Sequence, residues 1–358
     1  MVTGVREALT AENDGKAARK RSRGPVLLLG ILVLLLLVWS AYWFVAYRMA
    51  ESLIPSAAAA EQRGTAPAIA CADRTLGGFP LQLTIRCNGG SAATADGMRA
   101  TLGPFAATAP LYAPGRVVAG LSGPLQVDAP GFTLNASWTR ADVTADAGLI
   151  GTVGAVANLD GLFVDATADG VPLFSAQATN WGTEVRPADV ADALRLVLTA
   201  EDFVLTLDGA PYPNLSGTAS LTLLGAGQRL DRDPVAIFID WLAAGGTIRI
   251  EHASLASGTV NADVSGSLVL ERDGTLSGSI AVLYSGEEDL PLLVAAIFPW
   301  AGSQADVVAE AIVAVSRPIE LMGAPALEVH LMLDHGVVKY GLFPILTIPS
   351  VGSLAHLL

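Results

Sequence analysis

An uninterrupted apolar run from Val26 to Tyr47 constrains this chain more than any other feature, because it contains no charged residue. A helix rises about 1.5 Å per residue, so this run would reach roughly 33 Å and could cross a bilayer. The run is longer than the apolar core of a cleaved signal peptide, although Ala57 to Ala60 supply small residues of the kind found at cleavage sites. We expect an uncleaved anchor over residues 26–47, with a cleaved signal peptide as the alternative.

The residues on either side of the run predict its orientation. Basic residues outnumber acidic ones before it: Arg6, Lys16, Arg19, Lys20, Arg21 and Arg23, against Glu7, Glu12 and Asp14. This imbalance predicts a cytoplasmic tail over residues 1–25 and export of the chain after Arg48. Aromatic residues gather at the far end of the run, where we expect the outer membrane interface: Trp39, Tyr42, Trp43 and Tyr47. A stalk over residues 48–66 would then carry an exported domain over residues 67–358.

Composition excludes several classes of protein. The chain is 52% hydrophobic and only 15% charged, with a mean hydropathy of +0.50, which excludes a disordered chain and a coiled coil. The net charge is −13, and the basic tail makes the exported part more acidic still. Such a surface repels nucleic acid, so we expect no nucleic-acid partner.

Two cysteines, Cys71 and Cys87, lie in the exported part and flank a predicted hairpin. Its turn is expected near Gly78, Phe79 and Pro80, followed by a strand with Leu81, Leu83 and Ile85 on one face. In an oxidising compartment the two cysteines are expected to form a disulfide, with two separate buried thiols as the alternative. No histidine or second cysteine pair lies nearby, so we predict no metal site.

The rest of the exported part alternates apolar and polar residues between turns, which is typical of antiparallel strands. The clearest examples are a hairpin around Ala129-Pro130-Gly131, a long strand region over residues 194–207, and a hairpin over 265–284 with an Asp273-Gly274 turn. The pattern predicts a mainly β (α+β) fold with one large, curved antiparallel sheet. It leaves open whether that sheet is an open groove or a closed barrel.

Three helices are expected to interrupt the strands, over residues 234–245, 290–298 and 303–315. Each carries apolar residues at helical spacing, and Pro234 and Pro291 stand where a first turn accepts proline. Covering one face of the sheet is the simplest role for them. The alternative for the two later helices is that they line or close a hydrophobic groove.

Signatures of catalysis are absent from the sequence. The four histidines are His252, His330, His335 and His356, and no nucleophile elbow, phosphate-binding loop or dinucleotide fingerprint occurs in the exported part. Asp334 to Gly336 is interpreted as a hairpin turn. The acidic triplet Glu287 to Asp289 is interpreted as a helix start, with a cation site as the alternative. We expect no enzyme activity, no cofactor and no metal.

Several segments in one order resemble a family of uncharacterised, membrane-anchored bacterial proteins, domain of unknown function 2125. They are the aromatic-ended anchor, CADRTLGGFPLQLTIRC, LYAPGRVVAGLSGPL and the closing LMLDHGVVKYGLFPILTIPSV. Cys71, Gly78-Phe79-Pro80 and Cys87 match the family pattern, whereas Leu81 replaces its second aromatic residue. The resemblance implies an envelope protein with no established activity. The arrangement also looks like envelope proteins that shield lipid chains in a β-sheet groove, which is an architectural analogy only.

Two functions are therefore expected from this sequence. The first is a non-catalytic protein, tethered by one span in the bacterial inner membrane with its C-terminal domain in the periplasm, that binds a lipid or another hydrophobic ligand on a curved sheet. The second is a periplasmic scaffolding subunit that contacts partner proteins through an edge strand or the apolar tail GLFPILTIPSVGSL.

Overall fold

The computed structural model describes residues 34–45, 47–48, 68–94, 97–147, 153–207, 209–227, 241, 244–271, 273–321 and 324–350. Within them 22 strands form one antiparallel sheet, which confirms the predicted mainly β architecture. The strands are β1 (Ala68–Ala72), β2 (Thr75–Gly77), β3 (Gln82–Cys87), β4 (Gly89–Ala93), β5 (Arg99–Leu102), β6 (Phe105–Pro110), β7 (Arg116–Leu121), β8 (Leu125–Ala129), β9 (Phe132–Ser137), β10 (Arg140–Ala147), β11 (Val153–Ala168), β12 (Val171–Pro187), β13 (Ala193–Leu207), β14 (Ala210–Pro211), β15 (Leu215–Leu224), β16 (Thr247–Ser257), β17 (Val260–Leu270), β18 (Leu276–Ser285), β19 (Arg317–Leu321), β20 (Ala324–Asp334), β21 (Val337–Tyr340) and β22 (Phe343–Thr347).

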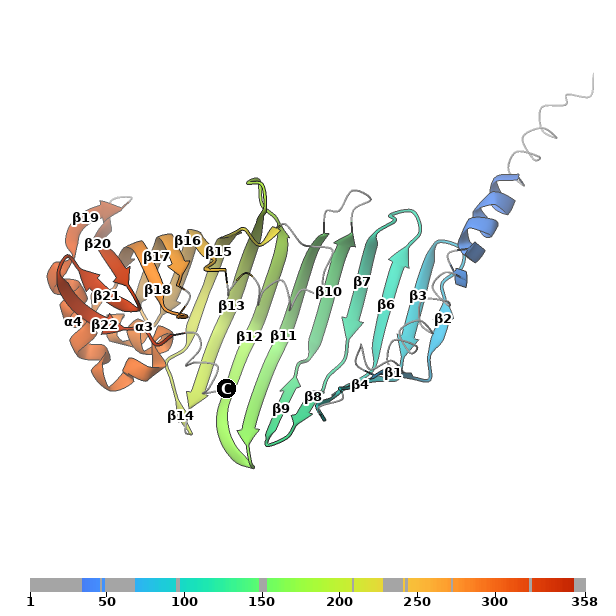
Figure 1. The fold of residues 1–358 in the computed structure, drawn as a ribbon, viewed down its shortest axis with the longest axis horizontal. Helices are drawn as coiled ribbons and strands as arrows, with labels where there is room; N and C mark the ends of the chain where they lie inside the picture. The colour runs from blue at the N-terminus through green and yellow to red at the C-terminus, as the bar shows by residue number, and fades with distance from the viewer. Residues whose placement is uncertain are drawn as a thin grey trace, which may run out of the picture.

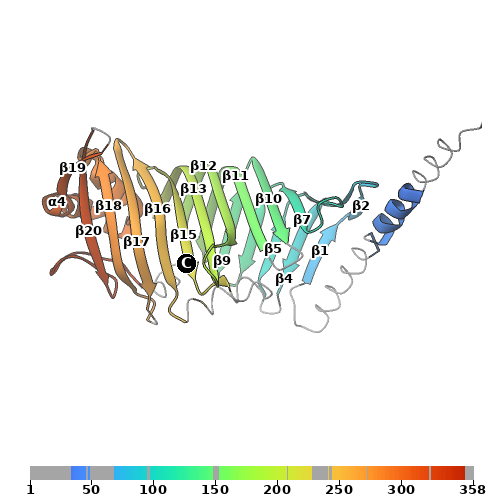
Figure 2. The same ribbon diagram turned by 90° about the horizontal axis from the view of Figure 1, so that it is seen from above.

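The strands follow one another along the longest axis of the molecule (Figures 1 and 2). A long row pairs in the order β2–β3–β6–β7–β10–β11–β12–β13–β15–β16–β17–β18–β20. A short row, β1–β4–β5–β8–β9, joins the second half of β11. Among the described strands the sheet stays open, because its edge strands β2 and β22 pair only with β3 and β21 and not with each other.

The short row continues the long row across sharp bends. One residue separates β3 from β4, Gly103-Pro104 separates β5 from β6, and residues 122–124 separate β7 from β8. Further along, β11 passes through Gly161 at φ 61° and β13 through Asp202 at φ 51°, conformations that favour glycine and short polar residues. We call this line of bends the crease. Figure 1 shows β4, β8 and β9 below β3, β7 and β10, on the other side of it.

Helices cover the sheet at its C-terminal end (Figure 1). They are η2 (Glu287–Asp289), α3 (Leu290–Ile297), η3 (Pro299–Gln304) and α4 (Ala305–Val315). The helices predicted at 290–298 and 303–315 are thus confirmed, although the second begins as a 3-10 helix. The helix predicted at 234–245 falls outside the described residues except for Trp241, 244 and 245.

The predicted anchor is described only in part. Residues 34–45 and 47–48 are helical, whereas the start of the predicted span and the stalk after Arg48 lie outside the described residues. No helix within the described part of the chain has the length and apolarity needed to cross a membrane.

The predicted hairpins are confirmed. β8 and β9 pair around residues 130–131, and β17 and β18 pair around the Asp273-Gly274 turn. β20 and β21 are joined by His335 and Gly336, which have φ angles of 48° and 80°, as a tight two-residue turn requires.

Candidate functional site

One face of the long row is apolar along its whole length. Residues directly opposite in an antiparallel pair point to the same side, so the register identifies each face. One chain of partners crosses the sheet from β3 to β20: Ile85, Ala107, Ala119, Val143, Ala157, Thr183, Leu198, Ala219, Ala253, Val264, Val282 and Val329. Thr183 is its single polar member, and its hydroxyl accepts a hydrogen bond from Trp181 Nε1 at 3.1 Å on the same face.

The opposite face carries the charged residues and most of the polar ones. In the neighbouring row, one residue away on each strand, the partners are Arg86, Ala106, Gly120, Asp142, Asn158, Gly182, Thr199, Thr218, Ser254, Asp263, Leu283 and Glu328. Ion pairs and hydrogen bonds cross the strands here, such as Arg116 Nε to Asp146 Oδ1 at 2.7 Å. The two sides, which we call the apolar face and the polar face, therefore meet different surroundings.

The apolar face lies on the inside of the crease. A Cβ atom placed on Gly90 of β4 would come 3.2 Å from Phe105 Cε1 of β6, so the Phe105 ring of the long row lies over the short row. Close to the crease, Trp181 and Phe203 place their ring centroids 6.0 Å apart. The small residues nearest the bends are buried: Cys87, Ala136, Ala141 and Ala178. The bend thus turns the apolar side inward and the charged side outward.

In the middle of the sheet the side chains of this face are only partly buried. Val143, Leu196 and Leu198 are all of intermediate burial. At the C-terminal end part of the same face is buried, with Val260 fully inaccessible and Val329 and Tyr284 each 2% exposed, while Val264 and Val282 beside the cavity are of intermediate burial. The buried core of the described residues therefore lies at one end, under α3 and α4.

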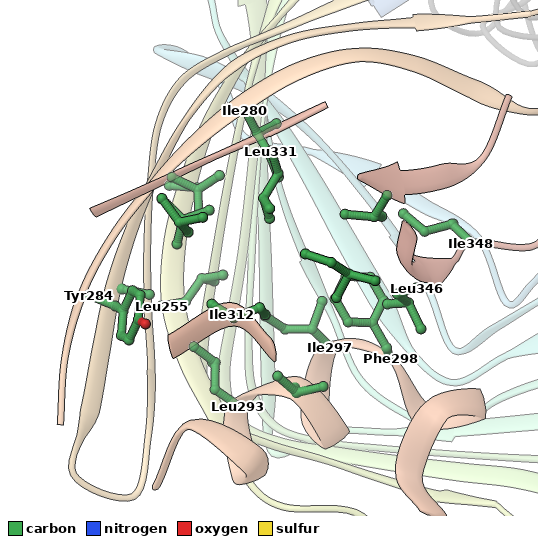
Figure 3. A pocket seen from close by; sticks show the side chains of 18 of the residues that line it. Leu255, Ile280, Tyr284, Leu293, Ile297, Phe298, Ile312, Leu331, Leu346 and Ile348 are labelled. Carbon is green, nitrogen blue, oxygen red and sulfur yellow. The ribbon is translucent and has the colours of Figure 1, made fainter. Parts of the chain in front are cut away.

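A cavity of about 390 Å³ occupies the junction between the helices and the apolar face. Figure 3 shows Leu293, Ile297, Phe298 and Ile312 of the helical segment facing sheet residues that include Leu255, Ile280 and Leu331. The lining is aliphatic and aromatic. Its one hydroxyl, that of Tyr284, is hydrogen-bonded to Ser316 Oγ at 2.8 Å, and burial raises the pKa of Tyr284. The two helices line the cavity and also pack into the core.

At the other end of the sheet, Cys71 of β1 and Cys87 of β3 form a disulfide, with their Cα atoms 5.4 Å apart. The turn between β2 and β3 contains the predicted residues Gly78, Phe79 and Pro80. Gln82 N–H donates to the Gly78 carbonyl at 3.1 Å. Gly78 has φ 104°, and a Cβ there would lie 2.7 Å from the Gln82 carbonyl oxygen, so the turn requires glycine.

Two groups of residues predicted separately, the interface aromatics and the turn, come together here. Trp39 Nε1 donates to the Pro80 carbonyl at 2.7 Å, and Trp43 Nε1 donates to the Gln82 carbonyl at 3.0 Å. The Trp43 ring packs edge-on against Phe79 with centroids 5.3 Å apart. Tyr42 packs beside Trp39 and Tyr47 stacks on Trp43. The N-terminal helix is therefore attached to the turn.

Titratable residues are dispersed in the structure. Within the described ranges, no three His, Cys, Asp or Glu side chains are grouped so as to hold a metal ion. His252, His330 and His335 each lie beside a different carboxylate, those of Asp263, Glu328 and Asp334.

In the acidic triplet, Asp289 Oδ2 accepts hydrogen bonds from Thr259 N and Oγ1, both at 2.7 Å. These bonds lower the pKa of Asp289. The carboxylate thus ties the start of the helical segment to the turn before β17, and Asp289 directly precedes α3 without a side-chain capping hydrogen bond to it.

Sequence reasoning identified the strands and the turn but missed the crease and the residues beside it, including Phe105, Trp181 and Phe203. A signal was present, because Gly103-Pro104 and Gly123-Pro124 interrupt segments that otherwise alternate as strands. We interpreted such residues as ordinary turns between strands. In the structure they mark where the chain crosses between the short row and the long row.

No curated protein and no solved structure matches this chain. A protein-family model does match, over residues 43–349, which include the disulfide, the crease and the cavity. That family is described as an uncharacterised protein conserved in bacteria, domain of unknown function 2125, and this chain belongs to it.

Proposed function

We propose that this chain is a non-catalytic, membrane-tethered envelope protein that binds a lipid, or another ligand with a long hydrocarbon chain, on the apolar face of its sheet. The observation that carries the proposal is the apolar chain of partners from Ile85 to Val329, half-exposed in the middle and leading into a cavity of about 390 Å³. A contiguous apolar surface of this extent is uncommon on soluble proteins unless something covers it.

The chemistry of the face favours a hydrocarbon ligand over a polar one. Its side chains offer dispersion contacts and exclude water, and each buried CH₂ group of a ligand contributes about 0.8 kcal/mol. Hydrogen-bonding groups on this face are already paired, since Tyr284 at the cavity bonds to Ser316 and Trp181 near the crease bonds to Thr183. A polar ligand would therefore lose its water without finding new partners.

Placement in the bacterial inner membrane, with the sheet in the periplasm, belongs to the same proposal. The apolar run at 26–47 and the basic tail before it support a single span. The disulfide between Cys71 and Cys87 supports an oxidising compartment on the side of the sheet.

Photo-crosslinking in cells tests the proposal. A photoreactive amino acid replaces Leu196 on the apolar face or its neighbour Val197 on the polar face of the full-length protein, both at intermediate burial. We expect lipid adducts by mass spectrometry from position 196 and none from position 197. Lipid at neither position, or equally at both, would show that the apolar face does not select a hydrophobic ligand.

A cavity-filling variant sharpens the same test. Ala253 lines the cavity, and Ala253→Phe would occupy part of its volume without adding a polar group. We expect this variant to lose crosslinking of lipid at residues next to the cavity while keeping it at position 196. An unchanged crosslinking pattern would place the ligand on the open face alone.

Scaffolding is the second candidate, and one observation favours it. The turn between β21 and β22 exposes Leu342 and Phe343, with 93% and 74% of their surface accessible. Exposed apolar tips of this kind suit contact with another protein. A photoreactive residue at Leu342 would crosslink a stoichiometric protein partner in that case, while Leu196 would capture no lipid.

A further inference from the structure

Apolar side chains project from two turns at the end of the sheet nearest the N-terminal helix. Phe79 and Leu81 of the β2–β3 turn are each 58% exposed, and Tyr112 of the β6–β7 turn is 72% exposed. The turns are joined, because Leu111 N–H donates to the Leu81 carbonyl at 3.0 Å. Together they form one exposed apolar surface, residues 78–81 and 111–115, which we call the foot.

The helix attached to the foot is apolar on every side. Its five consecutive residues Leu34 to Val38 are each 59–63% exposed, so no protein surface covers any side of this turn of helix. A helix that is hydrophobic all round requires an apolar environment. The sequence before it, from Val26, continues without a charge, as a segment within a bilayer would.

Trp39 and Trp43 set the position of the foot relative to that helix. Their indole N–H groups donate to the carbonyls of Pro80 and Gln82, and the Trp43 ring contacts Phe79. Tryptophan is favoured at the boundary between hydrocarbon and water, where its ring is in lipid and its N–H finds a polar partner. The foot therefore lies at the same depth as these two tryptophans.

We propose that the foot is immersed in the interfacial layer of the phospholipid bilayer that holds the helix. Phe79, Leu81 and Tyr112 contact lipid, while the carbonyls of the turn are satisfied by the tryptophans instead of by water. Leu81 directly precedes β3, whose Leu83 and Ile85 lie on one side at the start of the apolar face. A hydrocarbon chain could thus pass from the bilayer onto the sheet; that consequence rests on the proposed ligand binding, whereas the membrane contact rests only on the proposed membrane tether.

Depth-dependent fluorescence quenching tests the proposal on the full-length protein in vesicles of phosphatidylethanolamine and phosphatidylglycerol. An environment-sensitive fluorophore is attached at Leu81→Cys or Tyr112→Cys, with Val171→Cys and Leu342→Cys as controls. These controls are 63% and 93% exposed and lie away from the foot. Cys71 and Cys87 are bonded to each other and do not take the label.

We expect lipids that carry a quencher on the acyl chain to quench the label at positions 81 and 112 at least threefold more than at 171 and 342, and aqueous iodide to show the reverse order. Iodide quenching at position 81 or 112 equal to that at 171 would overturn the proposal. Two foot positions are used because a folding defect in one variant leaves the other to decide. Lipid crosslinking at Leu196 is measured separately. An apolar face that binds no lipid can therefore be distinguished from a foot that is exposed to water.

Discussion

The apolar face has two parts, one open in the middle of the sheet and one covered at the C-terminal end. Both show the same alternation of apolar and polar residues but have different surroundings. Val143 on β10 and Val329 on β20 belong to one chain of partners, yet Val143 is half-exposed and Val329 is 2% exposed. The difference comes from α3 and α4, which cover one end. The comparison teaches that strand alternation predicts which side of a sheet is apolar, whereas covering elements decide whether that side is a core or a surface.

The largest effect should come from placing a charge at each of these two positions. Val329→Asp would bury a carboxylate with no partner and lower the free energy of unfolding by about 3–5 kcal/mol. Val143→Asp, the matched change at a half-exposed position, should cost about 1 kcal/mol. Urea unfolding of the two purified variants measures both, and equal losses would mean that the middle of the face is covered as fully as the end.

The disulfide should matter next, because the described helices α3 and α4 pack on the other end of the sheet and not on the short row near β1. Removing the bond with Cys71→Ser and Cys87→Ser together should lower the free energy of unfolding by about 3 kcal/mol, since the unfolded chain regains the freedom of the closed loop. Thermal melting with and without reductant measures the change in the wild type, and the double variant is the control that reductant should not affect. A melting temperature insensitive to reductant would contradict this role.

The crease can be tested with a pair of glycines. Gly90→Leu should crowd Phe105 across the bend and cost about 1–3 kcal/mol, because its Cβ would lie 3.2 Å from the Phe105 ring and the ring would have to shift. Gly120→Leu on the polar face meets open space within 4 Å and should change stability by less than about 0.5 kcal/mol. Chemical unfolding measures the free energy of unfolding of both variants. A tolerated leucine at position 90 would mean that the short row and the long row do not approach each other there.

The smallest effect is a titration on the outer surface of the covered end. Hydrogen bonds from Lys339 and then His335 lower the pKa of Asp334 to about 2, while the Asp334 hydrogen bond raises the pKa of His335 above 6.5. A lowered carboxyl pKa stabilises the fold above pH 3.8, and this contribution is lost as the pH falls toward 2. A raised histidine pKa stabilises the fold below pH 6.5, and this contribution is lost as the pH rises through the pKa of the folded protein.

The variant Asp334→Asn removes the carboxylate and should return the pKa of His335 toward 6.5. Titration of the imidazole by nuclear magnetic resonance measures this shift, with His330 of β20 as an internal reference. An unchanged titration of His335 in the variant would show that Asp334 does not control its charge.

Much of the local structure could be predicted because it depends on neighbouring residues. Alternation located the strands, Asp273-Gly274 located a turn, and Pro291 at the first turn located α3. The disulfide could be predicted because one hairpin brings Cys71 close to Cys87. The crease could not, because glycine and proline mark a turn between strands and a bend within one strand equally well.

By itself the sequence determined the apolar run at 26–47, the two-sided pattern of the strands and the acidic, sparsely charged composition, because each is a property of residues close together in the chain. Only the tertiary structure decided which way the sheet bends, where α3 and α4 cover it, and that Trp39 and Trp43 contact the turn at Phe79 and Pro80. Those contacts join residues far apart in the chain, so their stability depends on the shapes of complete elements and not on local pattern.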